Sequence, residues 1–465
     1  MRSLAISVCL SALFLSACGG GSGSGQPPAS PIAVSISPGS TSMLVGTSST
    51  FSATVSGSTN QAVTFSVVGG DANGTITQAG VYTAPAVPGS FRVRATSMQD
   101  ASKFAEANIQ VRDYAGTTTA TPNMSVFRDY HTASLLADGS VLLVGGLDTV
   151  GFTRTVERYV EGSGFQITGS TIRPRMAHVA ALLPDGKVLI SGGTNYAEVY
   201  KDSEIYDRTT GQFTAGPEMK YPRREHVATR MSDGRILITG GMQLLGSGYG
   251  ATMNTELYDP GTNSFVELAR LNTGRYRHTA TLLANGRVLI VGGRDNNCTI
   301  NCEYHALRTA EIYDPASNLY SYTGEMSVGR FNHTATLLPN GKVLILGGET
   351  TDEIPGGTDQ VSTAEIYDPS TGLFTPAGNL VAGRSQHSAV MLNNGKILLA
   401  GGLAPSGLPT NTSEVFDPKS NSSAQGPLLN ELRARNTATK LNSGEVLIVG
   451  GHTSGQAVNS AEIYR

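Results

Sequence analysis

The chain has 465 residues, of which 33 are Lys or Arg and 36 are Asp or Glu, so its formal net charge is −3. This balance provides no field of one sign that would attract nucleic acid or an acidic membrane, and we expect no nucleic-acid partner. With 56 Gly and no Trp among its residues, and 39% of them hydrophobic, the chain has too much Gly for long helices and too many apolar residues for disorder. The composition therefore favours a mostly β protein.

The N-terminus has the features of an export signal. Residues 4–17 carry no charge, and this run is long enough for the apolar part of a signal peptide but shorter than the ~20 residues that cross a bilayer. The run ends in Leu15-Ser16-Ala17-Cys18, which resembles the lipobox of bacterial lipoproteins. The resemblance implies that residues 1–17 are removed and that Cys18 is lipidated, so that the lipid is the only membrane contact. Gly19 after the Cys implies the outer membrane of the cell envelope, whereas ordinary secretion with cleavage after Ala17 is the alternative.

A tether and a small β-domain are expected next. Residues 18–30 are rich in Gly, Ser and Pro and cannot bury a core, which predicts a flexible tether. In residues 31–112, short runs alternate apolar and polar residues between turn residues, a pattern typical of a β-sandwich. Residues 63–85 resemble bacterial immunoglobulin-like domains, with Phe65 where many such domains have a core Trp. We expect a spacer, and contact with carbohydrate or the cell wall is the alternative.

Seven Gly-Gly pairs, 47 to 55 residues apart, divide residues 118–465 into repeats. Each pair ends an apolar run, and each run follows an Asp-Gly, Asn-Gly or Ser-Gly turn of the kind that joins antiparallel strands. A Glu-x-Tyr or Glu-x-Phe segment follows each pair, and in most copies another aromatic residue stands seven positions later, such as Phe213 after Tyr206. The pairs begin at Gly145, Gly192, Gly240, Gly292, Gly347, Gly401 and Gly450.

This pattern resembles the kelch repeat, with Phe or Tyr in place of its usual Trp. The resemblance implies an all-β fold in which each repeat is a four-stranded blade of a seven-bladed β-propeller. The last repeat stops at Arg465, after its third strand, while residues 118–124 align with the fourth strand of a complete blade, residues 320–326. We therefore predict that the N-terminal strand completes the last blade and closes a monomeric ring.

Six repeats open with Arg-x-x-His, and the seventh has Arg433 with Asn436 in the His position. One His per blade gives a ring too wide for a single ion, so we expect neither a metal nor another cofactor. The Arg and the Glu of each repeat are predicted to lie at the same end of the blade, where Arg, His and Glu satisfy one another's hydrogen bonds. The six pairs are Arg128/His131, Arg175/His178, Arg223/His226, Arg275/His278, Arg330/His333 and Arg384/His387.

Residues 128–139 also resemble a segment of galactose and glyoxal oxidases in which adjacent Tyr and His bind copper. The resemblance maps these two ligands onto Tyr130 and His131, whereas Tyr304-His305 fits the segment poorly. Those oxidases add a Tyr cross-linked to a Cys and a His from a domain after the propeller, and neither is evident in this sequence. A copper-radical oxidase is therefore the alternative function, and we predict no catalytic residue.

Cys298 and Cys302 lie close together in a long loop of the fourth repeat. In an exported protein such a pair most simply forms a disulfide. Capture of a metal by the two Cys and His305 is the alternative.

The loops that join the second and third strands of propeller blades gather on one face. The longest here, residues 242–255, 294–310 and 349–364, carry Tyr249 and Tyr304 among polar residues, and with Arg128 and Tyr130 these are the candidate binding residues. Merely solvated insertions are the alternative for these loops. We predict a lipid-anchored envelope protein that binds a protein or carbohydrate partner, with a structural envelope component as a further alternative.

Overall fold

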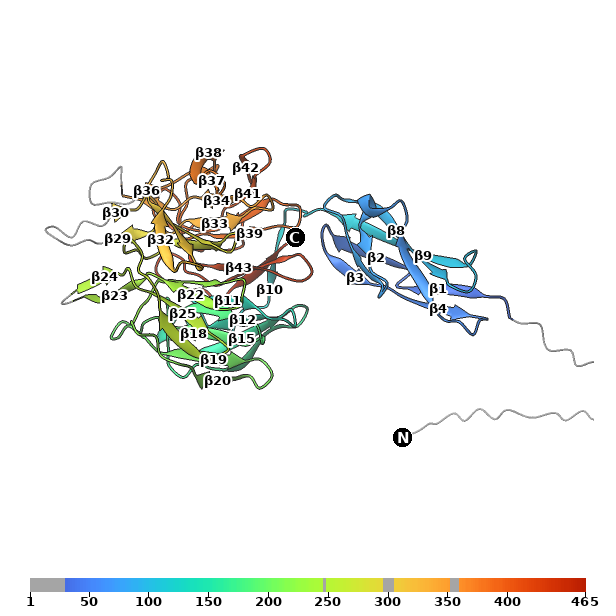
Figure 1. Cartoon of the computed structure of the whole chain (residues 1–465), viewed down its shortest axis with the longest axis horizontal. Helices are drawn as coiled ribbons and strands as arrows, with labels where there is room; N and C mark the ends of the chain where they lie inside the picture. The colour runs from blue at the N-terminus through green and yellow to red at the C-terminus, as the bar shows by residue number, and fades with distance from the viewer. Residues whose placement is uncertain (1–29, 246–247, 296–304, 352–358) are drawn as a thin grey trace, which may run out of the picture.

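The computed structural model describes residues 30–245, 248–295, 305–351 and 359–465. Their strands form a small N-terminal β unit and a wheel of four-stranded sheets (Figure 1). One short 3₁₀ helix, Asp71–Asn73, lies in the N-terminal unit. The described residues contain no helix long and apolar enough to span a membrane.

The N-terminal unit is built from three small sheets, ordered β1-β4, β2-β9-β8-β5 and β3-β7-β6. Its core consists of apolar side chains such as Phe51, Tyr82 and Val93, each at most 1% exposed. Phe65 belongs to the same core. The strands are β1 (Ala33–Ser37), β2 (Ser40–Leu44), β3 (Ser48–Thr50), β4 (Ser52–Ser56), β5 (Val63–Val67), β6 (Thr75–Ile76), β7 (Val81–Thr83), β8 (Gly89–Ser97) and β9 (Phe104–Arg112).

The other described residues form seven antiparallel sheets of four strands, which confirms the predicted seven-bladed β-propeller. Blades one to three are β11 (Thr132–Leu135), β12 (Val141–Val144), β15 (Thr155–Val160) and β16 (Gly164–Ser170); β17 (Val179–Leu182), β18 (Val188–Ser191), β19 (Ser203–Asp207) and β20 (Gln212–Ala215); and β21 (Val227–Arg230), β22 (Ile236–Thr239), β25 (Thr255–Asp259) and β26 (Ser264–Glu267). Blades four and five are β27 (Thr279–Leu282), β28 (Val288–Val291), β31 (Ala310–Asp314) and β32 (Leu319–Tyr322); and β33 (Thr334–Leu337), β34 (Val343–Leu346), β37 (Thr363–Asp368) and β38 (Leu373–Asn379). Blade six is β39 (Ser388–Met391), β40 (Ile397–Ala400), β41 (Ser413–Asp417) and β42 (Ser422–Gln425), and blade seven is β43 (Thr437–Lys440), β44 (Val446–Val449), β45 (Ala461–Tyr464) and β10 (Thr118–Thr121).

Short hairpins extend the loops between the second and third strands of four blades. In blades one, three, four and five they are β13 (Leu147–Asp148) with β14 (Gly151–Phe152), β23 (Met242–Leu245) with β24 (Gly248–Ala251), β29 (Arg294–Asp295) with β30 (His305–Ala306), and β35 (Glu349–Thr350) with β36 (Asp359–Gln360).

Apolar side chains fill the spaces between adjacent blades. Between blades one and two, for example, Leu142 of β12 packs with Ile190 of β18 and Tyr206 of β19, and all three are fully buried. Tyr206 also packs on Phe213 of β20, with 5.0 Å between ring centroids. The aromatic pair seven residues apart therefore joins the third and outer strands to the core.

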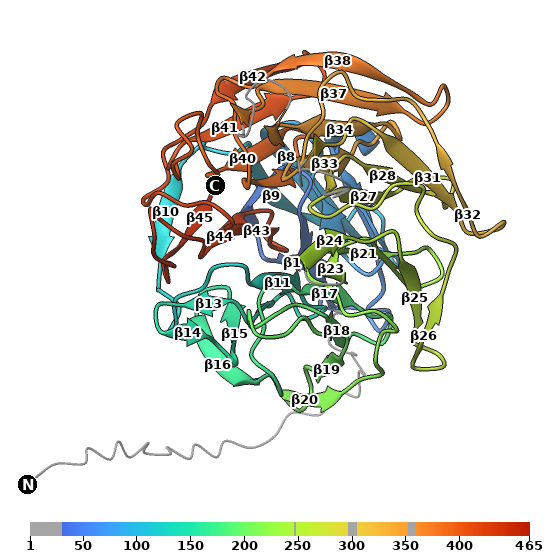
Figure 2. The same cartoon turned by 90° about the vertical axis from the view of Figure 1, so that its left-hand side faces the viewer.

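The first and last strands of the propeller meet in blade seven. Strand β10 pairs antiparallel with β45, with Thr118 opposite Tyr464 and Thr121 opposite Ala461 (Figure 2). This is the predicted closure by an N-terminal strand. Because β10 covers the free edge of β45, blade seven has the same four strands as the other blades.

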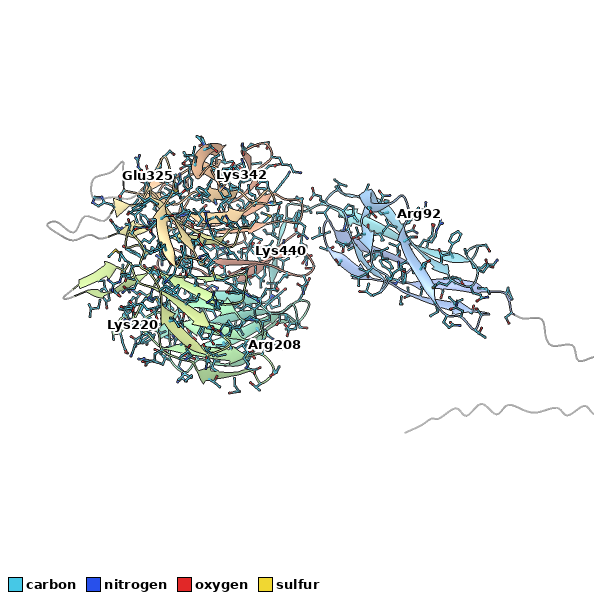
Figure 3. All side chains as sticks on the ribbon, viewed as in Figure 1. Arg92, Arg208, Lys220, Glu325, Lys342 and Lys440 are labelled. Atoms are coloured by element: carbon cyan, nitrogen blue, oxygen red, sulfur yellow. The ribbon has the colours of Figure 1, made fainter. Side chains whose placement is uncertain are left out.

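The wheel has two different faces. The turns between first and second strands point toward the N-terminal unit, and the hairpins β23–β24 and β29–β30 project from the opposite side (Figure 1). Figure 3 labels Lys342 and Lys440 on the side near the N-terminal unit, and Lys220 and Glu325 on the far side. We call the far side the loop face, and it points away from the N-terminal unit.

Tyr114 attaches the N-terminal unit to blades six and seven. Its ring stacks on Tyr464 with 5.8 Å between centroids, and its hydroxyl donates to the carbonyl of Gly444 at 2.7 Å. The same hydroxyl accepts from the backbone N–H of Asn393 at 3.2 Å. These contacts fix the N-terminal unit beside the closing strand.

Deleting residues 118–121 should weaken the ring. Loss of β10 exposes the edge of β45, so we expect a lower melting temperature and self-association through the free edge. Calorimetry and light scattering on the full chain in detergent measure both effects. A monomeric variant that melts at the wild-type temperature would contradict this closure.

Candidate functional site

A buried Arg–Glu ion pair stands in every blade. In blade four, Nη2 of Arg275 lies 2.7 Å from Oε1 of Glu311, both side chains are 0% exposed, and Nη1 of Arg275 donates to the carbonyl of Gly292 at 2.6 Å. Burial lowers the pKa of Arg275, but an Arg so far from neutral pH remains charged. The other pairs are Arg128–Glu157, Arg175–Glu204, Arg223–Glu256, Arg330–Glu365, Arg384–Glu414 and Arg433–Glu462. The prediction that Arg pairs with Glu is confirmed.

This pairing removes Arg128 from the candidate binding residues. Arg128 is 0% exposed, and its guanidinium donates to Glu157 and to the carbonyl of Gly145. The prediction of Arg128 as a binding residue is therefore wrong, because the same buried contacts recur for the first Arg of all seven repeats.

The first Gly of each Gly-Gly pair allows neighbouring blades to approach. At Gly292, φ is +59°, and a Cβ added there would lie 2.4 Å from the carbonyl oxygen of Arg330 and 2.9 Å from the ring of His333 in the next blade. A side chain would therefore push the blades apart. The Gly-Gly pairs, the Arg and the His are parts of one packing arrangement.

The His residues bond to hydroxyls of the preceding blade, which corrects the prediction that they pair with Arg and Glu. The Arg donors are already used by Glu and by a Gly carbonyl, so the imidazole turns to the neighbouring blade. The Nε2 contacts are His131 to Thr437 and His178 to Thr132 at 3.0 Å, His278 to Thr239 and His333 to Thr279 at 2.9 Å, and His387 to Thr334 at 3.1 Å. Asn436 replaces His in blade seven and donates to Ser388 at 2.7 Å.

His226 differs from the other His residues because the preceding blade has no Thr at either of the positions that bond to them. The position that holds Thr132, Thr279 or Thr334 in other blades is Val179 here, and Nε2 of His226 has no hydrogen-bond partner among the described residues. At the next junction Val227 also lacks a hydroxyl, but Thr239 takes its place, whereas the hydroxyl of Ser191, at the position of Thr239 in blade two, makes no hydrogen bond to a described residue.

The residues around Tyr130 and His131 do not fit a copper centre. Nε2 of His131 is bonded to Thr437, and its ring packs against Gly450, where an added Cβ would lie 3.3 Å from Nδ1. Burial lowers the pKa of His131 to about 3, as for the equivalent His333 and His387. Within the described ranges, no three His, Cys, Asp or Glu side chains converge on a metal position. His131 is thus part of the blade packing.

The residue before each His forms a ring around the propeller axis. In all seven blades it has a positive φ of 52–56°, a conformation that costs a non-glycine residue about 1–2 kcal/mol. The backbone N–H of six of these residues donates to the carbonyl of the preceding member, at 2.8 to 3.3 Å. We call this set the axial ring: Tyr130, Ala177, Glu225, Arg277, Asn332, Gln386 and Arg435.

The axial ring is interrupted at the junction of blades seven and one. The N–H of Tyr130 donates to Oδ1 of Asp129 at 2.9 Å instead of to a ring carbonyl. Arg435 of blade seven covers this junction, with its Cζ 4.0 Å from the centroid of the Tyr130 ring and its Nη1 3.0 Å from Oδ2 of Asp129. Tyr130, a predicted binding residue, therefore lies in the axial ring, partly buried under a cation.

The other polar side chains of the ring are also held in place. Nε and Nη2 of Arg277 donate to the two carboxylate oxygens of Glu225 at 2.9 and 2.8 Å. The amides of Asn332 and Gln386 both donate to Oε1 of Glu349, at 2.9 and 3.0 Å. The ring thus presents oriented guanidinium and amide groups rather than mobile side chains.

Exposed aromatic residues lie on the hairpins and loops around the ring. Tyr249 on β24 is 40% exposed, and Cζ of Arg224 lies 4.7 Å from its ring centroid. Tyr196, which is 57% exposed, packs against Phe152 of β14 with 5.0 Å between centroids. The predicted binding residue Tyr249 is therefore accessible on the loop face.

Some predicted residues lie outside the described residues. These are Cys18 for lipidation, the Cys298–Cys302 pair and Tyr304. His305, the third residue of the alternative metal site, is exposed on β30.

Arg277, Arg435, Glu225 and Gln386 were not predicted as site residues. The signal was available in the sequence, because each occupies the same place before the His, or before Asn436, of its repeat. The Arg and the His are nearly constant among the repeats, whereas the residue directly before the His changes from blade to blade.

Val179→Thr should stabilise the junction of blades two and three. The new hydroxyl supplies a partner to Nε2 of His226, and we expect about 1 kcal/mol of added stability in denaturant unfolding. Val227→Thr is the matched control, because His278 is already bonded to Thr239. Equal stabilisation by both variants, or by neither, would show that His226 does not lack a partner.

Stability should fall steeply below pH 6.5. Burial lowers the pKa of the His residues, to about 3 for His131, His333 and His387, so the folded state stays neutral while the unfolded state binds protons. Each buried His then contributes roughly 1 kcal/mol of lost stability per pH unit between pH 6.5 and its folded pKa. His387→Asn, which copies Asn436, should reduce this slope by one proton in urea titrations between pH 6.5 and 5. An unchanged slope would place His387 in contact with solvent.

No family model matches the chain. Human Kelch-like protein 38 is 29% identical over 89 residues, which are 19% of this chain and 15% of the relative. The tRNA wybutosine-synthesizing protein 4 of Saccharomyces cerevisiae is 34% identical over 89 residues, 19% of this chain and 12% of the relative. The match therefore spans less than a sixth of either curated relative.

Two solved structures share the fold. One is described as a novel fungal alcohol oxidase of the AA5 family in complex with copper; it has a TM-score of 0.60 at 18% identity and covers 74% of this chain and 76% of its own. The other is the structure of YjhT, with a TM-score of 0.51 at 14% identity, covering 65% of this chain and 99% of its own. With the seven Gly-Gly repeats and their closed ring of sheets, these likenesses show a β-propeller of the kelch type.

Proposed function

We propose that this chain is a binding protein that recognises a protein or glycan partner on its loop face, around the axial ring. The observation that supports this proposal is the difference between constant and variable positions in the repeats. The ion-paired Arg recurs in every blade, whereas the adjacent ring positions, with the same backbone geometry, carry Tyr, Ala, Glu, Arg, Asn, Gln and Arg. A scaffold requires the constant residues, and a recognition surface is what varied polar side chains on a fixed backbone provide.

The arrangement of the chain supports presentation of this face to a partner. The N-terminal unit is attached to the opposite face, beside blades six and seven, through Tyr114. A lipid on Cys18, as the sequence predicts, would then anchor the molecule at the cell envelope by the end of the chain that precedes this unit. The hairpins β23–β24 and β29–β30 of the loop face lie on the side away from the N-terminal unit (Figure 1).

The side chains of the loop face suit polar ligands. Guanidinium and amide groups held by carboxylates form directional hydrogen bonds, and exposed Tyr196 and Tyr249 offer rings against which a sugar or a side chain can pack. The copper oxidase among the structural neighbours suggests oxidase chemistry at the same place, but Nε2 of His131 is bonded to Thr437 and its ring packs against Gly450. Binding without turnover is the function that these side chains support.

Tyr130→Ala should weaken binding, and Lys342→Ala should not. We expect the loss of Tyr130 to reduce the affinity for captured ligands at least tenfold, because its ring also holds Arg435 in place. The measurement is binding of the full chain in detergent to a glycan panel and to solubilised envelope proteins. Lys342 lies on the side near the N-terminal unit and serves as the control.

Equal loss of binding in both variants, or loss in neither, would place the binding surface away from the axial ring. Peroxide release from alcohols by the copper-treated chain, abolished by Tyr130→Phe, would instead favour the oxidase.

A further inference from the structure

The axial ring contains hydrogen-bond donors in excess of acceptors on the side of Tyr130. Nη1 of Arg277 donates to no described residue, since its bonds to Glu225 use Nε and Nη2. Arg435 uses only Nη1, toward Asp129, which leaves Nε and Nη2 without a described acceptor. The hydroxyl of Tyr130 likewise has no hydrogen-bond partner among the described residues.

Each carboxylate oxygen beside these donors already accepts one hydrogen bond. Both carboxylate oxygens of Glu225 accept from Arg277, and the two oxygens of Asp129 accept from the N–H of Tyr130 and from Arg435. Glu225 and Asp129 are also more buried, at 11% and 6% exposed, than Arg277 and Arg435, at 24% and 27%. The accessible part of each ion pair is therefore its cation.

The three donor side chains belong to one ring of residues around the axis. Arg435 stacks on the Tyr130 ring at 4.0 Å, and the ring of backbone hydrogen bonds places Tyr130, Glu225 and Arg277 around the same axis. Burial raises the pKa of Tyr130, Arg435 and Arg277 oppose this rise, and Glu225 and Asp129 add to it. Arg435 and Tyr130 are therefore in direct contact, and Arg277 belongs to the same axial ring.

We propose that Arg277, Arg435 and Tyr130 form a subsite for the carboxylate of an acidic sugar on the partner glycan. A carboxylate brings acceptors and no donors, which is what the unused N–H and O–H groups require, and planar guanidiniums bind it with paired hydrogen bonds. Exposed Tyr196 and Tyr249 on the surrounding loops supply rings for packing of sugar rings. This subsite rests on the proposed binding function and specifies the class of its ligand.

The test compares two matched ligands that differ in one group. Oligomers of galacturonic acid carry the carboxylate, and oligomers of galactose carry a hydroxymethyl group in its place. Titration calorimetry of the full chain in detergent should show at least tenfold tighter binding of the acidic oligomer, and this preference should shrink as salt is added.

Three variants separate the roles of the side chains. Arg435→Gln and Arg277→Gln should each reduce the affinity for the acidic oligomer about tenfold and leave binding of the neutral oligomer unchanged, and Tyr130→Phe should produce a smaller loss because the ring remains under Arg435. Arg208→Gln, on an exposed Arg that is 37% accessible, is the charge-matched control and should change neither affinity. Melting temperatures show whether each variant folds. If Arg435→Gln does not fold, Tyr130→Phe, which keeps the aromatic ring and its packing, still tests the subsite.

The outcomes distinguish the subsite from the proposed function. Equal affinity for the acidic and neutral oligomers, with both lost in Tyr130→Ala, would overturn the carboxylate subsite and leave the binding function in place. Binding of a poly-glutamate peptide in preference to both oligomers would overturn the glycan and point to an acidic protein partner. If Arg208→Gln weakens binding of the acidic oligomer as much as Arg435→Gln does, the preference comes from the overall charge of the protein, and the subsite is overturned.

Discussion

The architecture depends on the buried ion pair between the first Arg and the Glu of each repeat. The two side chains of the pair also bind backbone groups. In blade five, Arg330 donates to the carbonyl of Gly347, and Glu365 accepts from the backbone N–H of Ser327. One charged contact thus ties the second and third strands to the segment that arrives from the preceding blade. Removing either partner would leave a buried charge, at a cost of about 3–5 kcal/mol. Repetition of this contact makes every blade begin in the same geometry.

That fixed beginning permits the variation next to it. Between the ion-paired Arg and the buried His, two residues are held by bonds of their backbone rather than of their side chains. Glu225, for example, is fixed by its N–H to the carbonyl of Ala177 and by its carbonyl to the N–H of Arg277. Its side chain is then used for a contact with Arg277, and the conformational strain of its positive φ is compensated by the ring. A site can therefore change in chemistry without change in the scaffold.

The sequence predicted the parts of the fold that depend on local patterns. Asn-Gly turns, alternating apolar runs and the recurrence of Gly-Gly were enough for seven sheets, and the alignment of residues 118–124 was enough for the closing strand. The contacts between blades were not predictable in this way. The bonded His residues join to hydroxyls of the preceding blade, as His333 does to Thr279, so a spacing within one repeat pointed to the wrong partners. Pairing of Arg128 with the Glu of its repeat was predicted, but the complete burial of Arg128 by Glu157 and the carbonyl of Gly145 was not.

The junction between blade seven and blade one differs from the six other junctions between blades. There the ring hydrogen bond is missing, since the N–H of Tyr130 turns to Asp129, and Arg435 bridges the junction with its stacked guanidinium. On the opposite face the same blade seven carries Tyr464, against which Tyr114 of the linker stacks. The closing strand β10 pairs with the strand that holds Tyr464. Side-chain contacts stabilise both faces of this junction, where the chain does not run on from one blade to the next. A ligand held by Arg435 and Tyr130 would bind groups from the first and last blades at once, and its binding energy would therefore add to the stability of the closed ring.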